Sequence, residues 1–267
     1  MHLLPTISTT NVQEVYHGAE GRLWELVMGE QIHIGGLNSS MDLAERAGIA
    51  AGSQGVDLCC CNGAGCRFLL RFRGVAQMTG VDMTPEVLEL GRSRNQRDGH
   101  GNTITFVQAY ADRSGLPTGK ADFVWGEDAW CYVPDKSALI KEAARLVRPG
   151  GTIAFTDWCE GKIPMTAAEA ARFMAFMKFP SFSSIPDYMR LLSDNGCKVE
   201  LAEDTGRFPA CVDLYLNMLT QQLTSDALRI IGWNQEVFAG LGGEMAFVQN
   251  LAHAGKLVQA RFVARKP

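Results

Sequence analysis

The sequence lacks the long apolar runs that membrane insertion requires. No stretch in it reaches the ~18 consecutive apolar residues that span a bilayer. Residues 1–6 also lack the positive charge and the apolar run of a secretory signal. We therefore predict a cytoplasmic protein with no membrane partner.

Basic charge is scarce as well, since the chain carries a net charge of −4 at pH 7. Proteins that bind nucleic acid present a basic face to the phosphate backbone, so we expect no nucleic-acid partner. The hydrophobic share of 46% and the charged share of 20% are those of a globular protein. The 267 residues suit one large domain or two small ones, and neither an internal repeat nor a low-complexity linker divides them.

Cysteine is plentiful, but the paired motifs of metal sites are missing. Four of the eight cysteines lie within Cys59–Cys66. Three of them are adjacent at the end of an expected strand, where side chains alternate in direction and cannot converge on one tetrahedral ion. No CxxC pair elsewhere completes a site, and no secretory signal favours a disulfide framework. We predict reduced, buried thiols and no bound metal.

The stretch Gly55–Cys66 is the centre of the chain's organisation. Val56 and Leu58 indicate a buried strand, residues 62–65 a glycine turn, and residues 66–72 a helix. The first turn of such a helix offers free backbone N–H groups to a ligand. A strand, a glycine turn and a helix present a cofactor at the carboxyl ends of the strands in a doubly wound α/β sheet.

The alternation of strands and helices continues along the chain. Further strands are expected at 77–82, 103–108, 121–125, 152–157, 198–202 and 255–266, and helices at 84–96, 135–147, 167–179, 185–192 and 211–252. Asp82 ends the second strand about 20 residues past the turn, where an acid can accept hydrogen bonds from both hydroxyls of a ribose. We predict an α/β fold with a doubly wound, mainly parallel, seven-stranded sheet and a helical lid insertion. The expected segments are an N-terminal cap (1–36), a cofactor-binding core (37–158), the lid (159–196) and the rest of the core sheet (197–267).

Polar residues at a strand end and in one loop are candidates for a site. Glu127 and Asp128 follow the fourth strand, at the edge where parallel sheets bind ligands. His33 lies between two isoleucines and precedes two glycines, so it either reaches over the site or is a satisfied, half-buried histidine. The spacing alone favours the second alternative. Asn38–Ser40 is expected to cap a helix that continues to about Ala47.

Together these motifs resemble the class I S-adenosylmethionine-dependent methyltransferases. Their first turn usually reads Asp-x-Gly-x-Gly-x-Gly, and Asp57–Gly63 lies on it, followed in order by Asp82 and Arg148–Gly151. Gly29–Gly35 and Gly255–Lys266 are similar to a subgroup with sarcosine/dimethylglycine N-methyltransferases, phosphoethanolamine N-methyltransferases and geranyl diphosphate C-methyltransferases. The resemblance implies a Rossmann-like methyltransferase fold and S-adenosylmethionine as cofactor. It also implies methyl transfer to nitrogen or carbon of a small-molecule substrate by in-line attack.

The resemblance also implies roles for single residues. Cofactor binding falls to Tyr16, Asp57, Cys59, Cys61, Gly63, Asp82, Met83, Tyr110, Ala111 and Gly126. An amine acceptor needs a group that orients or removes a proton, and the candidates are Asp128, Glu127, Tyr132 and His33. Trp130 and Tyr16 are the candidate substrate contacts, which with Glu127 would stabilise a carbocation formed from an alkene.

The chain departs from the pattern of the family at several positions. Cys59 and Cys61 replace glycines, and a side chain held at positive φ costs roughly 1–2 kcal/mol, so the turn could follow a different path. Tyr110 replaces the usual acid beside adenine. Tyr132 stands where the phosphoethanolamine enzymes have a histidine, which argues against that substrate.

Two other classes of function remain open. Asp82 and the turn also fit an NAD-dependent oxidoreductase, although the turn does not read Gly-x-Gly-x-x-Gly. A non-catalytic module that binds S-adenosylmethionine is the other alternative. The sequence leaves the oligomeric state open, and a homo-oligomer is compatible with it.

Overall fold

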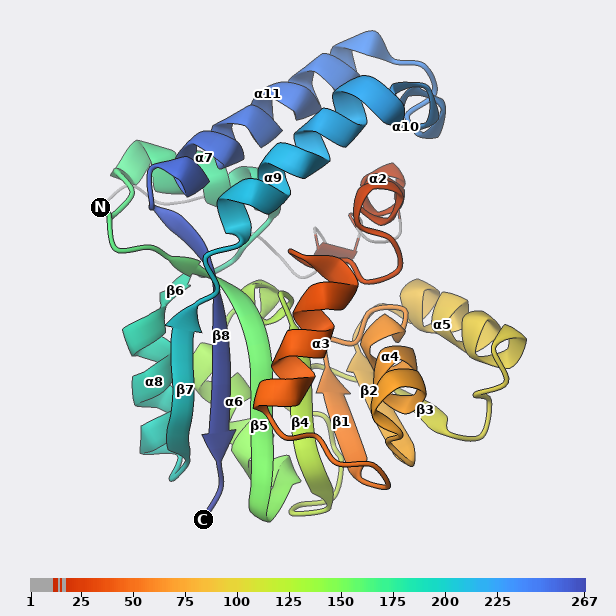
Figure 1. The fold of residues 1–267 in the computed structure, drawn as a ribbon, viewed down its shortest axis with the longest axis vertical. Coiled ribbons are helices and arrows are strands. Elements are labelled where there is room, and N and C mark those ends of the chain that lie inside the picture. The colour runs from red at the N-terminus through yellow and green to blue at the C-terminus, as the bar shows by residue number, and fades with distance from the viewer. Residues whose placement is uncertain (1–11, 14, 16–17) are drawn as a thin grey trace.

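The structure is a computed structural model that describes residues 12–13, 15 and 18–267. An eight-stranded sheet forms its centre (Figure 1). Its strands are β1 (Gln54–Leu58), β2 (Gln77–Asp82), β3 (Ile104–Gln108), β4 (Ala121–Glu127), β5 (Val147–Glu160), β6 (Ser183–Ser184), β7 (Lys198–Asp204) and β8 (Leu257–Arg265). Seven of them follow the order β3-β2-β1-β4-β5-β8-β7, and β6 pairs with β5 outside this path. β8 is antiparallel to β5 and β7, and the other neighbours are parallel. The predicted mainly parallel sheet of seven strands is confirmed, with β6 as a short addition.

Helices cover both faces of the sheet because successive residues of a strand point to opposite faces. One face carries α3 (Gly36–Arg46), α4 (Ala64–Arg73) and α5 (Pro85–Arg97), and the other carries α6 (Lys136–Leu146) and α8 (Ile185–Asp194). In β4, Phe123 and Trp125 belong to the apolar core under α3–α5, whereas Val124 belongs to the core under α6 and α8. The sheet is therefore buried on both sides, as a doubly wound fold requires.

A helical cap lies over the carboxyl ends of the parallel strands (Figure 1). It consists of α2 (Ala19–Met28), α7 (Ala167–Met177), α9 (Phe208–Asn217), the π-helical turn η2 (Met218–Gln222), α10 (Thr224–Ile230) and α11 (Gln235–His253). Its core is aromatic, with Trp158 packed edge-on against Phe179 and Phe208 at centroid distances of 5.6 and 4.7 Å. Within the described residues, none of the helices combines the length and apolar character of a membrane span.

The segment 159–196 contains two helices with different surroundings. α7 packs in the cap, whereas α8 packs against α6 and β7. The apolar side chains of α7, such as Phe173 and Met177, are buried in the aromatic core of the cap. The boundaries of the four segments stay predictions.

The start of α3 differs from the prediction. Asn38–Ser40 lie inside the helix, because the left-handed Gly35 at φ 84° turns the chain so that the helix already begins at Gly36. The expected cap at these residues is therefore wrong, and Ser40 is buried instead. Asp135 caps α6, since its carboxylate accepts a hydrogen bond from the Ala138 N–H at 2.9 Å.

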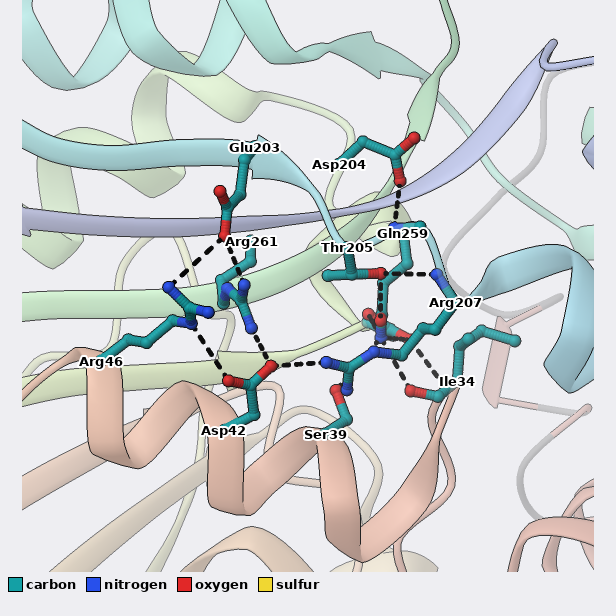
Figure 2. Close-up of polar contacts among 12 residues, drawn as sticks. Ile34, Ser39, Asp42, Arg46, Glu203, Asp204, Thr205, Arg207, Gln259 and Arg261 are labelled. Carbon is teal, nitrogen blue, oxygen red and sulfur yellow. Dashed lines mark hydrogen bonds and ion pairs between the residues drawn. The ribbon is translucent and has the colours of Figure 1, made fainter.

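Charged side chains hold α3 against β7 and β8 (Figure 2). Asp42 on α3 accepts hydrogen bonds from Arg207 and from Arg261 of β8. Arg261 also donates to Glu203 on β7. The Arg261 side chain is 5% exposed, whereas the side chains of Asp42 and Glu203 are 31% and 40% exposed, so these ion pairs are only partly buried. Because α3 directly follows the loop 29–35, this network also fixes the end of that loop.

Candidate active site

The turn after β1 keeps the backbone of a glycine turn although cysteines stand in it. Cys59 and Cys61 have φ values of 64° and 48°, and Gly63 has a φ of 76°. The expected strain at the two cysteines is thus present, and hydrogen bonds of the turn offset it. The Cys61 N–H donates to Asp82 Oδ2 at 2.9 Å, which ties the turn to the end of β2.

A cavity of about 1100 Å³, which we name the main cavity, lies at the carboxyl ends of β1, β2 and β4. Of the predicted site residues, its walls include His33, Asp57, Cys59, Cys61, Asp82, Met83, Tyr110, Ala111, Glu127, Asp128 and Tyr132. Gly63 and Gly126 are not part of the described lining, but both pack closely against aromatic side chains next to it. At Gly63 a Cβ would lie 2.5 Å from Phe106 Cζ. At Gly126 it would lie 2.2 Å from Trp130 Nε1. The fold thus brings most of the predicted site residues together.

Trp130 does not reach the main cavity. Its ring is fully buried and stacks on Phe155 at a centroid distance of 4.0 Å. The indole N–H donates to the Leu58 carbonyl oxygen at 3.2 Å, so the polar edge is also turned into the core. Trp130 is therefore part of the core under β1 and is not available as a substrate contact. Tyr16, the other expected substrate contact, lies outside the described residues.

Carboxyl groups dominate the polar walls of the main cavity. They belong to Glu30, Asp57, Asp82, Asp112, Glu127 and Asp128, and the described lining contains neither lysine nor arginine. Asp57 and Glu127 both lie close to Gly65. If Gly65 carried a Cβ atom, that atom would lie 2.9 Å from Asp57 Oδ2 and 3.6 Å from Glu127 Oε2. Burial raises the pKa of Asp57 well above its usual range, and the neighbouring Glu127 adds to the effect. Such a cavity stabilises a cation and opposes a phosphate.

Asp82 is held so that both carboxylate oxygens have fixed positions. Oδ2 accepts the Cys61 N–H and Oδ1 accepts the Thr84 N–H, each at 2.9 Å. Burial raises the pKa of Asp82, and these hydrogen bonds oppose that change. Met83 lines the cavity beside it, and Tyr110 lies at the rim with 42% of its surface exposed. This wall suits a ribose and the flat base attached to it.

His33 is buried, and its two ring nitrogens differ in their surroundings. Nε2 lies 3.1 Å from Ser40 Oγ and 3.3 Å from Glu127 Oε1. Nδ1 is buried and makes no hydrogen bond within the described part of the chain. Burial lowers the pKa of His33, although the charge of Asp128 acts in the opposite direction. His33 is therefore buried rather than half-buried, and its Nε2 edge faces Ser40 and Glu127.

Asp128 holds the loop that carries His33. Its backbone is left-handed at φ 50°, a conformation that a non-glycine residue keeps only where the surroundings impose it. Oδ2 accepts the Ile34 N–H at 2.8 Å. The Gln259 amide donates to the Ile34 carbonyl oxygen at 2.9 Å (Figure 2). It also donates to the Asp128 carboxylate. Burial raises the pKa of Asp128 to about 6.

Several residues of the site were not expected from the sequence. Ser40 and Gln259 contact the His33 loop, and Gly65 leaves the space between two carboxyls. Gln259 could have been found from the sequence, because it is a polar residue in an otherwise apolar strand that is buried on both faces. Among the described residues, no group of three or more histidine, cysteine, aspartate or glutamate side chains is arranged to hold a metal ion.

Residues 56–155, which span β1 to the middle of β5, match the model of a family described as "Methyltransferase domain". The chain carries a methyltransferase domain. The predicted family is thereby confirmed for these residues. The match includes the turn, Asp82, Glu127 and Asp128, so it covers the acidic walls of the main cavity.

Similar proteins support the placement of this methyltransferase domain. Methyltransferase GfsG of Streptomyces halstedii is 30% identical over 115 residues, which are 43% of this chain and 41% of the relative. Sterol 24-C-methyltransferase of Eremothecium gossypii is 22% identical over 270 residues, covering 96% of this chain and 64% of the relative. The chain thus spans less than two thirds of the length of these curated relatives.

A solved methyltransferase structure confirms the fold over nearly the whole chain. Phosphoethanolamine N-methyltransferase 2 of Haemonchus contortus superimposes with a TM-score of 0.84 at 18% identity. The superposition covers 97% of this chain and 58% of the other. The cap and the sheet therefore both belong to the known methyltransferase architecture.

Proposed function

We propose that the chain transfers a methyl group from S-adenosylmethionine to an oxygen or nitrogen atom of a small molecule. The observation that carries the proposal is the acidic main cavity, in which Asp57 and Glu127 converge at Gly65 and no lysine or arginine lies in the described lining. S-adenosylmethionine carries a sulfonium and an ammonium group, so it brings two positive charges to these carboxyls.

The walls of the main cavity offer a partner for each part of this cofactor. Asp57 and Glu127 would hold the positive groups, and the free N–H groups at the start of α4 would hold the carboxylate. Asp82 would accept both ribose hydroxyls, and Met83 would pack on the base. When bound, the cofactor supplies an electrophilic methyl group: an acceptor lone pair forms the new bond, and the S–C electron pair stays on sulfur.

His33 is the proposed general base. Because Nε2 faces Ser40 and Glu127, the ring would donate from Nε2, and Nδ1 would take the proton of the acceptor. The lowered pKa of His33 keeps the ring neutral at pH 7. Glu127 orients the ring and stabilises it once protonated, as a carboxylate does for a catalytic histidine. The proton then passes to solvent.

Asp128 and Tyr132 have supporting roles in this proposal. Asp128 is a positioning residue, because its oxygens are occupied by Ile34 and Gln259. Tyr132 lines the cavity, packs edge-on against Phe179 at 4.9 Å, and contacts the acceptor. Transfer to an alkene carbon is disfavoured, since Trp130 is buried in the core.

The two other classes of function fit the site less well. An NAD-dependent oxidoreductase has to bind a diphosphate, which the carboxyl groups of the main cavity repel. A non-catalytic module has no use for His33, whose burial and unpaired Nδ1 cost stability. We keep a cytoplasmic location and the open oligomeric state as predictions, to be tested by cell fractionation and light scattering.

Calorimetric titration with S-adenosylhomocysteine and, in parallel, with NAD tests the proposal. We expect binding in the micromolar range for S-adenosylhomocysteine and no heat with NAD. Asp82→Ala should weaken the binding of S-adenosylhomocysteine at least about tenfold, since it removes a charge-assisted bond to the ribose. Asp194→Ala, at the exposed end of α8, is the matched control. Absence of S-adenosylhomocysteine binding by the wild type refutes the proposal.

A further inference from the structure

A second cavity lies inside the cap, and we name it the cap chamber. It has a volume of about 680 Å³ and lies between α2, α7, α9, η2, α10 and α11. Its walls are mainly apolar, with Leu23, Val27, Leu216, Leu219 and Met245 among them. Because η2 is π-helical and forms part of the wall, the cap departs from regular helix at this chamber, as is common near functional sites.

A smaller cavity of about 300 Å³, which we name the junction, lies beside both the main cavity and the cap chamber. It shares Ile32, His33, Asp128 and Tyr132 with the walls of the main cavity. It shares Trp24 of α2 with the walls of the cap chamber. Trp24 therefore forms the wall that the cap chamber and the junction have in common, and His33 lies on the other side of the junction.

Lysine and arginine are absent from the described lining of all three cavities. Three basic residues of the cap are engaged elsewhere, whereas Arg22 of α2 lines a neighbouring cavity that shares Ile32 and Cys61 with the main cavity. Arg172 pairs with Glu244 at 3.0 Å, Lys178 donates to the Ala175 carbonyl oxygen at 3.1 Å, and Arg207 pairs with Asp42. Residues 1–17 contain neither lysine nor arginine, so the chain before α2 adds none. The described lining of the three cavities therefore offers no lysine or arginine to pair with a phosphate, diphosphate or carboxylate of the acceptor.

The cap chamber is also tied to the His33 loop by a hydrogen bond. Tyr215 of α9 lines the chamber, and its hydroxyl accepts the Gly35 N–H at 3.0 Å. Gly35 is two residues from His33 and at φ 84°. The position of the loop therefore depends on the same helix that forms the wall of the chamber.

We propose that the methyl acceptor is an uncharged molecule with a largely apolar body, which occupies the cap chamber and extends a hydroxyl or amine through the junction to His33. This inference rests on the proposed function and names the substrate class of that site. The proposed acceptor differs from that of phosphoethanolamine enzymes, which carries a phosphate. The acceptor gains affinity from burial of its apolar body, at roughly 25 cal/mol per Å².

Binding of the neutral dye N-phenyl-1-naphthylamine to the protein saturated with S-adenosylhomocysteine tests the inference. Gly242 of α11 lines the chamber, and a side chain added there meets open space within 4 Å. Gly242→Phe should fill part of the chamber and weaken the binding of the dye at least about tenfold. Gly240→Phe is the matched control, since Gly240 lies on the same helix with open space around it and is not part of the described chamber lining. It should leave the dye affinity within about twofold.

Displacement of the dye by a matched pair of ligands then reports on charge. Dodecanol should displace the dye at a concentration at least about tenfold lower than dodecyl phosphate does. Equal or stronger displacement by dodecyl phosphate overturns the inference, as does dye binding that is absent from the wild type or unchanged in Gly242→Phe. The affinity of each variant for S-adenosylhomocysteine, measured by calorimetry, shows that it is folded. Failure of the proposed function appears separately, as loss of S-adenosylhomocysteine binding by the wild type.

Discussion

Gln259 and Asp128 lie 131 positions apart in the sequence, yet the Gln259 amide is 3.1 and 2.8 Å from the two carboxylate oxygens of Asp128. Both side chains are buried. The pair places a residue of β8 in contact with the end of β4, directly beneath the loop of His33.

Gln259→Leu should therefore destabilise the protein. The substitution leaves the buried Asp128 carboxylate without its amide partner, which we expect to lower the free energy of unfolding by about 2–3 kcal/mol. Urea denaturation measures the change. Gln96→Leu, at an exposed position of α5, serves as the control and should stay within about 0.5 kcal/mol of the wild type. Equal stabilities for the two variants would show that the amide does not support Asp128.

Stability should also depend on pH through Glu127. Burial raises the pKa of its carboxyl from 4.5 to about 7 in the folded state. The folded protein then binds a proton that the unfolded chain has released. The contribution of Glu127 to stability is therefore fully present below pH 4.5 and is lost as the pH rises toward 7. We expect this group to remove roughly 2–4 kcal/mol across that interval. Unfolding of the ligand-free protein from about pH 5 to pH 8 measures it.

The Glu127→Gln variant is the comparison for this pH dependence. An amide does not titrate, so the variant should lose less stability than the wild type over the same interval. Asp57 and Asp128 have raised pKa values as well and contribute the slope that remains. Parallel curves for the two proteins would rule out Glu127 as a titrating group.

Removal of His33 should affect chemistry more than cofactor binding. With an acceptor found by a labelled-methyl screen, His33→Ala should lower kcat by about 10²–10⁴-fold, the usual contribution of a general base. The affinity for S-adenosylhomocysteine should change little. Added imidazole should restore part of the rate, which a purely structural role would not permit. His253→Ala removes an exposed histidine of α11 and is expected to be silent.

Much of the fold and part of the site follow from the sequence because they depend on local patterns. Alternating apolar strands, the glycine turn and Asp82 at a strand end are visible without tertiary structure. The pairing of His33 with Ser40 depends on how α3 packs, and the role of Gln259 depends on which strand inserts beside β5. Trp130 was expected in the site because it follows Glu127 closely, but the turn after β4 directs its ring into the core.

The cysteine turn offers a test of backbone strain. Cys61→Gly should change stability by no more than about 1 kcal/mol, since relief of the left-handed strain offsets the greater entropy of glycine in the unfolded chain. Cys60→Gly should destabilise by about 1–3 kcal/mol, because Cys60 is buried and not among the residues at positive φ. Thermal unfolding of both variants measures the difference, and a larger loss for Cys61→Gly would contradict this account.

The position of β8 in the sheet determines when the sheet can be completed during synthesis. β8 inserts between β5 and β7 although it follows both in the chain, and it brings Gln259 to Ile34 across 225 positions. During synthesis β1, β2 and β4 therefore leave the ribosome long before Gln259, which holds the loop of the proposed base His33. The strands of the proposed cofactor site are made early, but the His33 loop is held in place only when β8 closes the sheet.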